Sequence, residues 1–170
     1  LCLGTMMFAD QTELAEARRI TAHARDNGVN FIDTADVYSL GKSESMVGEL
    51  LEGQRHDWVL ATKCGNKMSE RPTEVHYSRT WVQRECDASL QRLGTDHIDL
   101  YYLHRPDTSI PIEETVGAMA ELVEAGKVRH LGLSEREVAD CTRAIMFATL
   151  RGLDSHGIVS ILPGVSSSVK

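Results

Sequence analysis

The sequence alternates short β-rich runs with amphipathic segments, and this alternation constrains the fold more than any other feature. Most of the runs are continuously apolar, as strands covered on both faces should be, and they recur at a spacing of roughly 30 residues, the period of parallel βα units. No linker rich in glycine, proline or serine divides the chain, so the pattern predicts one α/β domain over residues 1–170. The expected strands are 1–5, 31–35, 58–63, 98–103, 128–133 and 158–162.

Helix signals fill the intervals between these runs. Asp10 and Glu13 resemble a capping box before a first helix that ends near Gly28. Pro111 should begin a fourth helix, with Gly126 as its stop, and a fifth is expected from about 136 to 150. Apolar stripes mark the buried faces of the second, third and fourth helices: Met46, Val47, Leu50 and Leu51; Val82, Cys86, Leu90 and Leu93; and Ile112, Val116, Met119 and Val123.

Two folds share this period, the closed TIM-type barrel and the open doubly wound sheet. An open dinucleotide-binding sheet carries the fingerprint GxGxxG between its first strand and first helix. This chain instead has Leu-Gly-Thr-Met-Met-Phe at residues 3–8. The missing fingerprint favours the barrel, in which chemistry is placed at the C-terminal ends of several strands.

Four residues suited to proton transfer end consecutive predicted strands: Asp33 and Tyr38 follow the second, Lys63 the third and His104 the fourth. A tyrosine phenol is a weak acid at neutral pH, and a nearby ammonium would stabilise its phenolate. A carboxylate would anchor the ammonium, and an imidazole would orient a substrate carbonyl. Taken singly, Tyr38 reads as a loop aromatic, Lys63 as a solvated charge and His104 as a core residue. The hypothesis of a catalytic site therefore depends on their convergence.

The composition limits the classes of partner. Twenty-five acidic and eighteen basic side chains give a net charge of −7, and no Lys/Arg-rich stripe is present, which argues against nucleic acid and anionic membranes as partners. The four cysteines show no CxxC or Cys/His ligand spacing, so we expect no metal site and a cytoplasmic protein with reduced thiols. With no long apolar run and no basic-then-apolar leader, no membrane association is expected.

Several motifs resemble those of the aldo-keto reductase family. Residues 31–38, Phe-Ile-Asp-Thr-Ala-Asp-Val-Tyr, followed by Ser-Glu at 43–44 and Val-Gly at 47–48, are similar to the family's first signature. Residues 61–65, Ala-Thr-Lys-Cys-Gly, resemble its lysine strand, and residues 101–107, Tyr-Tyr-Leu-His-Arg-Pro-Asp, resemble its histidine strand. Residues 119–134 resemble the stretch that leads into the cofactor site. These matches cover residues 1 to about 135 almost continuously.

The resemblance implies a TIM-type (β/α)8 barrel that binds NADPH, rather than NADH, over its C-terminal mouth. It also implies reduction of a small-molecule aldehyde or ketone to an alcohol by hydride transfer. In this interpretation Tyr38 is the general acid, Lys63 and Asp33 tune it, and His104 positions the carbonyl group.

Cofactor contacts are implied in the same way. Ser134 matches a residue that contacts the nicotinamide carboxamide, while Glu135 departs from the Asn or Arg of several family members. Residues 158–170 resemble the final barrel strand and a turn in which Gly164, Ser166 and Lys170 would meet the adenosine phosphates; a Ser-rich tail is the alternative. The candidate cofactor residues are Gly4, Thr5, Met6, Asp33, Ser134, Gly164, Ser166 and Lys170.

The strand count departs from the family pattern. Such a barrel has eight strands and usually about 250 residues, whereas six strands are recognisable here and 135–157 is atypical, without a sixth or seventh. We therefore expect an incomplete barrel, from a fragment or an internally deleted chain. A reduced barrel, or a second chain covering the open edges, is the alternative.

Two expectations follow from the incomplete barrel. The isolated chain should have low stability and self-associate through its sheet edges. Its function has an alternative, a non-enzymatic or inactive cofactor-binding or regulatory fragment of an aldo-keto reductase. A barrel isomerase or lyase would leave the pairing of tyrosine with lysine unexplained.

Overall fold

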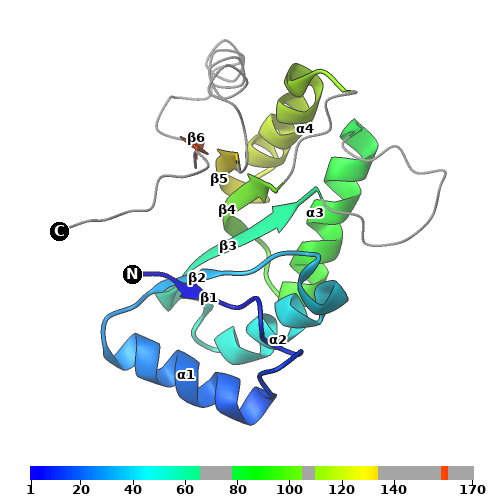
Figure 1. Ribbon diagram of the computed structural model, residues 1–170. Coiled ribbons are helices and arrows are strands. Elements are labelled where there is room, and N and C mark those ends of the chain that lie inside the picture. The colour runs from blue at the N-terminus through cyan, green and yellow to red at the C-terminus, as the bar shows by residue number, and fades with distance from the viewer. Residues whose placement is uncertain (66–77, 105–109, 134–157, 161–170) are drawn as a thin grey trace.

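The computed structural model describes residues 1–65, 78–104, 110–133 and 158–160, the last segment for its backbone alone. Its centre is a six-stranded parallel sheet in which each strand pairs with the next one along the chain (Figure 1). This is the strand order expected for an incomplete TIM-type barrel. The strands are β1 (Leu3–Gly4), β2 (Phe31–Asp33), β3 (Val59–Cys64), β4 (Ile98–Leu103), β5 (Val128–Leu133) and β6 (Ile158–Ser160). The described helices are α1 (Leu14–Asp26), α2 (Lys42–Leu51), α3 (Arg79–Leu93) and α4 (Ile112–Glu124), with the 3-10 turns η1 (Tyr38–Gly41) and η2 (Arg55–Asp57).

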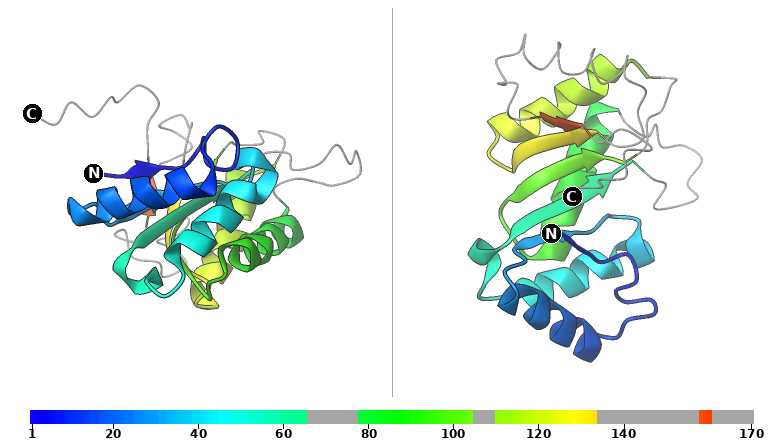
Figure 2. Two further views of the ribbon diagram at one scale, coloured as in Figure 1. Left: turned by 90° about the horizontal axis from the view of Figure 1, so that it is seen from below. Right: turned by 60° about the vertical axis from the view of Figure 1, so that its left-hand side comes forward.

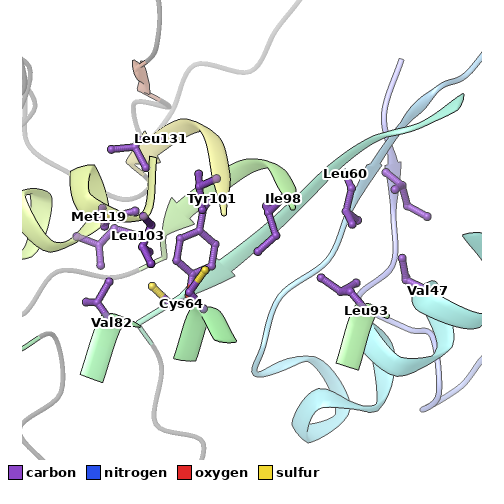
Figure 3. Packing of buried hydrophobic residues seen from close by; sticks show 14 of the residues in the cluster. Val47, Leu60, Cys64, Val82, Leu93, Ile98, Tyr101, Leu103, Met119 and Leu131 are labelled. Atoms are coloured by element: carbon purple, nitrogen blue, oxygen red, sulfur yellow. The ribbon is translucent and has the colours of Figure 1, made fainter. Parts of the chain in front are cut away.

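The main core lies between the sheet and the four helices, which gather on one side of it (Figure 2). Alternate strand residues such as Leu60, Tyr101 and Leu131 point to this side (Figure 3). They belong to the same core cluster as Val47 of α2 and Met119 of α4. The predicted stripes account for the helix side of this core, because Val47, Leu50, Leu51, Val82, Cys86, Leu93, Ile112, Val116 and Met119 are all buried. Residues of the opposite parity face the other side of the sheet, where Ala61, Leu100 and Tyr102 form a smaller apolar cluster.

The ends of the elements differ from the predictions where local turns compete with regular structure. β4 and β5 have the predicted bounds, whereas β1 stops at Gly4 because Thr5 closes a turn, its carbonyl accepting the N–H of Phe8 at 2.9 Å. The predicted capping box is wrong. Glu13 occupies the N-cap position without a side-chain hydrogen bond, and Asp10 lies in a separate turn, its N–H donating to the carbonyl of Met7 at 3.3 Å. The predicted fifth helix lies outside the described residues.

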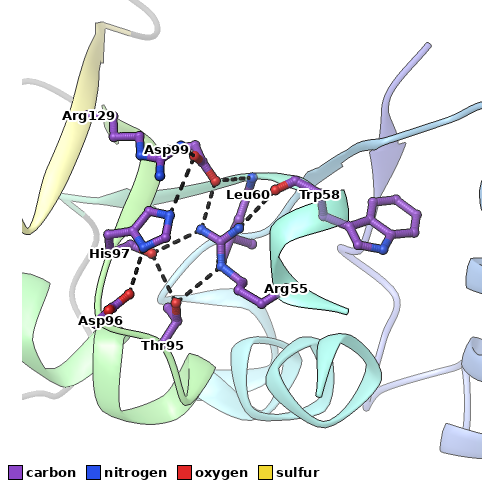
Figure 4. Close-up of polar contacts among 8 residues, drawn as sticks. All are labelled: Arg55, Trp58, Leu60, Thr95, Asp96, His97, Asp99 and Arg129. Carbon is purple, nitrogen blue, oxygen red and sulfur yellow. Dashed lines mark hydrogen bonds and ion pairs between the residues drawn. The ribbon is translucent and has the colours of Figure 1, made fainter. Parts of the chain in front are cut away.

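A buried aspartate ties three strands together at the end of the sheet where the strands begin (Figure 4). Asp99 accepts hydrogen bonds from the N–H of Leu60 at 3.0 Å, from Arg55 Nη2 at 2.7 Å and from Arg129 Nη1 at 3.0 Å. Burial by itself would raise the pKa of Asp99, but the N–H of Leu60 and the guanidinium of Arg55 hold that pKa below its ordinary value. This end of a barrel serves stability, which leaves the opposite end for chemistry.

None of the described helices combines the length and the apolar character that crossing a membrane requires.

Candidate active site

Asp33 and Lys63 meet at the C-terminal ends of two neighbouring strands. Asp33 is level with Ala61 in the β2–β3 register, and Lys63 lies two residues further along β3, on the same face of the sheet. Lys63 Nζ donates to Asp33 Oδ1 at 2.5 Å. The side chains are only 11% and 24% exposed, for Lys63 and Asp33 respectively, so solvent ions screen the pair weakly.

The Lys63 ammonium also contacts the loop that follows β2. It donates to the carbonyl of Thr34 at 2.8 Å and to the hydroxyl of Tyr38 at 3.4 Å. The same nitrogen lies 4.9 Å from the centre of the Tyr38 ring. An ammonium has three hydrogens to donate, and Asp33, Thr34 and Tyr38 accept all three, which fixes the direction in which the lysine points.

Tyr38 is held at the start of η1 by a compact turn. Its N–H donates to the carbonyl of Ala35 at 3.2 Å. The three residues after it all have positive φ, with Ser39 at 49°, Leu40 at 54° and Gly41 at 86°. For the two non-glycine residues this conformation is strained. These residues complete η1, and α2 begins directly after them at Lys42.

His104 reaches the site from the end of β4. Its N–H donates to the carbonyl of Cys64 at 2.7 Å, which extends the pairing of β3 and β4 by one step. The rings of Tyr38 and His104 meet edge to face, with centroids 6.2 Å apart and planes at 86°. The structure thus brings Asp33, Tyr38, Lys63 and His104 together. Their catalytic roles remain a prediction.

A cluster of buried hydroxyls fixes the loops beneath these four residues. Ser43 Oγ donates to the carbonyl of Thr5 at 2.9 Å and lies 3.1 Å from the hydroxyl of Thr34. Thr5 Oγ1 in turn donates to the carbonyl of Asp33 at 3.0 Å. All three hydroxyl-bearing residues are fully buried. The cluster joins the ends of β1 and β2 to the first turn of α2, and through Thr34 it holds one of the acceptors of Lys63.

Two buried carboxyl groups lie on the helix side of the site. Glu44 accepts from Thr62 Oγ1 and from Arg92 Nε, both at 2.6 Å. Asp36 Oδ1 accepts the N–H of Val37 at 2.6 Å, whereas Asp36 Oδ2 is buried and has no hydrogen-bond partner among the described residues. Burial, and then the charge of Glu44, raise the pKa of Asp36 to about 8. The Asp36 carboxyl is therefore mostly protonated at neutral pH.

Sequence reasoning did not single out Tyr102 as part of the site. It is level with Lys63 in the β3–β4 register and lies two residues before His104, so it shares the face of the sheet that carries both. Its ring packs over Gly132 of β5, where a Cβ would collide with it. Burial, and then the charge of Asp33, raise the pKa of Tyr102 to about 12. Counting back by two from His104 along the predicted strand would have found this residue.

The candidate cofactor residues divide into two sets. At the end of β1, a Cβ added to Gly4 would meet no atom within 4 Å, and the Met6 side chain is exposed. Gly4 is paired with Asp33 in the β1–β2 register, and the contact of either residue with a cofactor stays a prediction. The hydroxyl of Thr5 is already engaged within the protein, so its contribution would be to hold the loop. The second set, Ser134, Gly164, Ser166 and Lys170, lies outside the described residues.

No group of histidine, cysteine, aspartate or glutamate side chains in the described part of the chain is arranged to hold a metal ion.

Comparisons with known proteins identify the family of the chain. A family model described as "Aldo/keto reductase family" matches residues 1–161. Over 146 residues the chain is 39% identical to "Probable aldo-keto reductase 1" of Glycine max, covering 84% of this chain and 42% of that protein. Over 147 residues it is 39% identical to "Aldo-keto reductase YhdN" of Bacillus subtilis (strain 168), covering 84% of this chain and 44% of that protein. It therefore spans less than half the length of these curated relatives.

A solved structure shows the same relationship in three dimensions. The holo form of aldo-keto reductase AKR11C1 from Bacillus halodurans superposes with a TM-score of 0.78 at 31% identity, covering 95% of this chain and 60% of that one. The six parallel strands are therefore part of a TIM-type barrel, which confirms the predicted incomplete (β/α)8 fold. With a family match over residues 1–161 and the same fold, the chain belongs to the aldo/keto reductase family.

Proposed function

We propose that this protein reduces aldehydes or ketones to alcohols with NADPH as the reductant. When bound, the nicotinamide would supply the hydride that adds to the carbonyl carbon. Tyr38 would donate the proton that completes the alcohol at the carbonyl oxygen. The membership of the chain in the aldo/keto reductase family supports this reaction class.

The observation that carries the proposal is the position of the Lys63 ammonium. It contacts the Asp33 carboxylate at 2.5 Å and the Tyr38 hydroxyl at 3.4 Å. A cation in this position would attract the negative charge that develops on the Tyr38 oxygen while the proton is transferred. Asp33 holds the ammonium in place through this contact. His104, whose ring meets that of Tyr38, would donate a hydrogen bond to the same carbonyl oxygen and orient it.

Gly4 and Met6 at the end of β1 would lie against the cofactor, with Asp33 beside them. We propose NADPH in preference to NADH on the resemblance alone, in which Lys170 is the residue available to meet the 2′-phosphate that NADPH carries and NADH lacks. Replacing Lys170 by Met should therefore weaken binding of NADPH more than binding of NADH.

Turnover tests the proposal. NADPH consumption is followed with a simple aldehyde for the wild type, for Tyr38→Phe and for the control Tyr101→Phe. The control makes the same change on β4, on the face of the sheet that packs against the helices. We expect Tyr38→Phe to lose about 100- to 10,000-fold in kcat, since general acid catalysis contributes on that scale, and Tyr101→Phe to retain activity. Equal turnover by Tyr38→Phe and the wild type would overturn the role of Tyr38.

A second candidate function is cofactor binding without catalysis. The observation that favours it is that the chain spans 42% and 44% of the two curated relatives. A change in NADPH fluorescence on mixing, with no turnover of any aldehyde, would establish this alternative. Absence of both binding and turnover would defeat both functions for this chain.

A further inference from the structure

The first turn of α2 is tied to two other elements by one buried carboxylate. Glu44 is fully buried, and its Oε1 accepts a hydrogen bond from Thr62 Oγ1 at 2.6 Å. Its Oε2 accepts one from Arg92 Nε, also at 2.6 Å. Arg92 is held in turn, since its Nη2 donates to Ser89 Oγ at 3.1 Å. The carboxylate of Glu44 therefore joins α2 to β3 and to the last turn of α3.

The contact with Thr62 fixes β3 one residue before Lys63. Thr62 is level with Tyr101 in the β3–β4 register, and Tyr101 belongs to the core beneath the helices. Successive strand residues point to opposite faces of a sheet, so Thr62 lies on the helix side while Lys63 lies in the site. A shift of β3 at Thr62 would move Lys63 with it, because a planar peptide bond joins the two residues.

The contact with Arg92 supports the turn that carries Tyr38. This turn, η1, begins at Tyr38 and ends at Gly41. A Cβ added to Gly41 would lie 2.8 Å from Arg92 Cδ and 3.1 Å from Arg92 Nε, so the arginine side chain packs directly against the glycine. Gly41 has a φ of 86°, a conformation that glycine adopts readily. The arginine therefore restricts how far the end of the turn can move toward α3.

The burial of this ion pair favours a geometric role over a contribution to stability. The Glu44 side chain is 0% exposed and that of Arg92 22%. A buried carboxylate is unfavourable unless it is paired, and exchanging such a pair for apolar side chains of similar volume is often neutral or stabilising. The hydrogen bonds of the pair do impose one defined arrangement on the elements that they join. Here two of those elements, β3 and the turn that leads into α2, carry Lys63 and Tyr38.

We propose that Glu44 is a positioning residue that sets the distance between the Lys63 ammonium and the Tyr38 hydroxyl. It acts on the reaction only through other residues: through β3 on Lys63 and, with Arg92, through η1 on Tyr38. The effect on turnover rests on the proposed function, whereas the effect on the distance does not.

A pair of substitutions at Thr62 tests the hydrogen bond apart from packing. Thr62→Val keeps the branched shape but removes the hydroxyl that Glu44 accepts, and it changes no charge. Thr62→Ser keeps the hydroxyl and loses a methyl group. If the hydrogen bond positions the site, the valine variant is impaired and the serine variant resembles the wild type. If Thr62 only fills space, the order is reversed.

NMR measures the geometry without turnover. Lys63 Nζ lies 4.9 Å from the centre of the Tyr38 ring, so the methylene group that bears Nζ should give a nuclear Overhauser effect to the ring protons. We expect Thr62→Val to weaken this signal by at least about twofold, because its intensity falls as the sixth power of distance and a displacement of about 1 Å is enough to misplace a reacting group. Thr62→Ser should keep the wild-type signal.

Steady-state kinetics measures the consequence for the reaction. Thr62→Val and Glu44→Gln should each lower kcat by about 10- to 100-fold, the effect of such a displacement, with KM for the aldehyde unchanged because the substrate loses no contact. The control Glu121→Gln makes the same change in a carboxylate that pairs with Arg79 Nε at 2.8 Å and joins α4 to α3. It should keep the wild-type kcat.

Four results would overturn the inference. These are a wild type without the nuclear Overhauser effect, a Thr62→Val chain with the wild-type signal and kcat, a Thr62→Ser chain as impaired as Thr62→Val, and a raised KM at unchanged kcat. If Thr62→Val does not fold, Glu44→Gln is compared with Glu121→Gln by the same signal. If the wild type consumes no NADPH, the proposed function fails alone and the NMR comparison still decides the role of Glu44.

Discussion

At the scale of single residues, the most unusual group near the site is the Asp36 carboxyl. It is fully buried, one of its oxygens lacks a hydrogen-bond partner among the described residues, and its pKa is raised to about 8. The charged groups that act on it come from the packed helices: Glu44 and Glu85 raise its pKa, and Arg92 lowers it. Asp36 therefore couples the stability of this region to pH.

The raised pKa of Asp36 predicts that the folded chain loses stability as pH rises toward 8. Its pKa in the folded chain lies above the ordinary value of 3.8, so between about pH 4 and pH 8 the folded state keeps a proton that the unfolded state releases. This contribution to stability is complete below about pH 4. It is lost as pH rises through the folded pKa, by at most roughly 1.4 kcal/mol per pH unit.

Urea denaturation of the wild type and of Asp36→Asn across this pH range measures the effect. The amide stays neutral at every pH, so Asp36→Asn should flatten the dependence and be the more stable chain at pH 8. The exposed Asp26→Asn serves as the control and should follow the wild type. Parallel curves for the wild type and Asp36→Asn would refute the buried protonation.

Relief of backbone strain at Leu40 gives a second prediction at this scale. Leu40→Gly removes a side chain at a φ of 54° that is 70% exposed and so contributes little packing. Glycine adopts this conformation freely but loses more entropy on folding. We expect a net gain of about 0.5–1 kcal/mol in the free energy of unfolding. Ala22→Gly, inside α1 at an exposed position, should instead lose about 1 kcal/mol. Destabilisation by both changes would show that Leu40 is not strained.

At the scale of elements, the sequence predicts the strands better than the contacts between them. The bounds of β4 and β5 follow from continuous apolar runs, and the convergence of Asp33, Lys63 and His104 follows from parallel strands ending at one edge. The hydrogen bonds of Ser43 could not be predicted in the same way. They link residues 38 positions apart, to Thr5, and depend on how α2 lies against two loops. The predicted capping box is wrong because Asp10 belongs to the turn after β1 and not to the N-terminus of α1.

The contacts of Asp99 with β3 and β5 predict how much this residue contributes to the free energy of unfolding. Asp99→Ala leaves the buried N–H of Leu60 and the guanidinium of Arg55 without their acceptor, so the free energy of unfolding should fall by about 2–4 kcal/mol. Asp87→Ala also removes an ion pair, with Lys127 at 2.5 Å, but that pair is exposed and the loss should stay below about 1 kcal/mol. Chemical denaturation measures both. Equal losses would contradict the structural role assigned to Asp99.

At the scale of the whole molecule, the described sheet is open, with β1 at one edge and β6 at the other. A strand edge with unpaired backbone groups pairs readily with other chains. Leu1 adds a fully exposed apolar side chain next to β1. These features predict that a chain of residues 1–170 self-associates in solution.

Sedimentation velocity at several concentrations tests this expectation. The wild type should show a concentration-dependent increase in mass, and Leu1→Lys should reduce it, because a charge beside an edge strand discourages pairing. Ala22→Lys adds the same charge on α1, away from the sheet edge, and should not reduce the association. A monomeric mass at all concentrations, together with a sharp two-state thermal transition, would contradict the prediction.

The central claim is that Tyr38 and Lys63 act as one proton-transfer unit. Its most direct test is kcat/KM for NADPH-dependent aldehyde reduction by the wild type, Tyr38→Phe, Lys63→Met and the double variant. Residues that act as a unit give strongly non-additive losses. We predict that each single variant loses at least about 100-fold and that the double variant is no worse than Tyr38→Phe. Wild-type turnover by Tyr38→Phe, or losses that multiply in the double variant, would contradict the account.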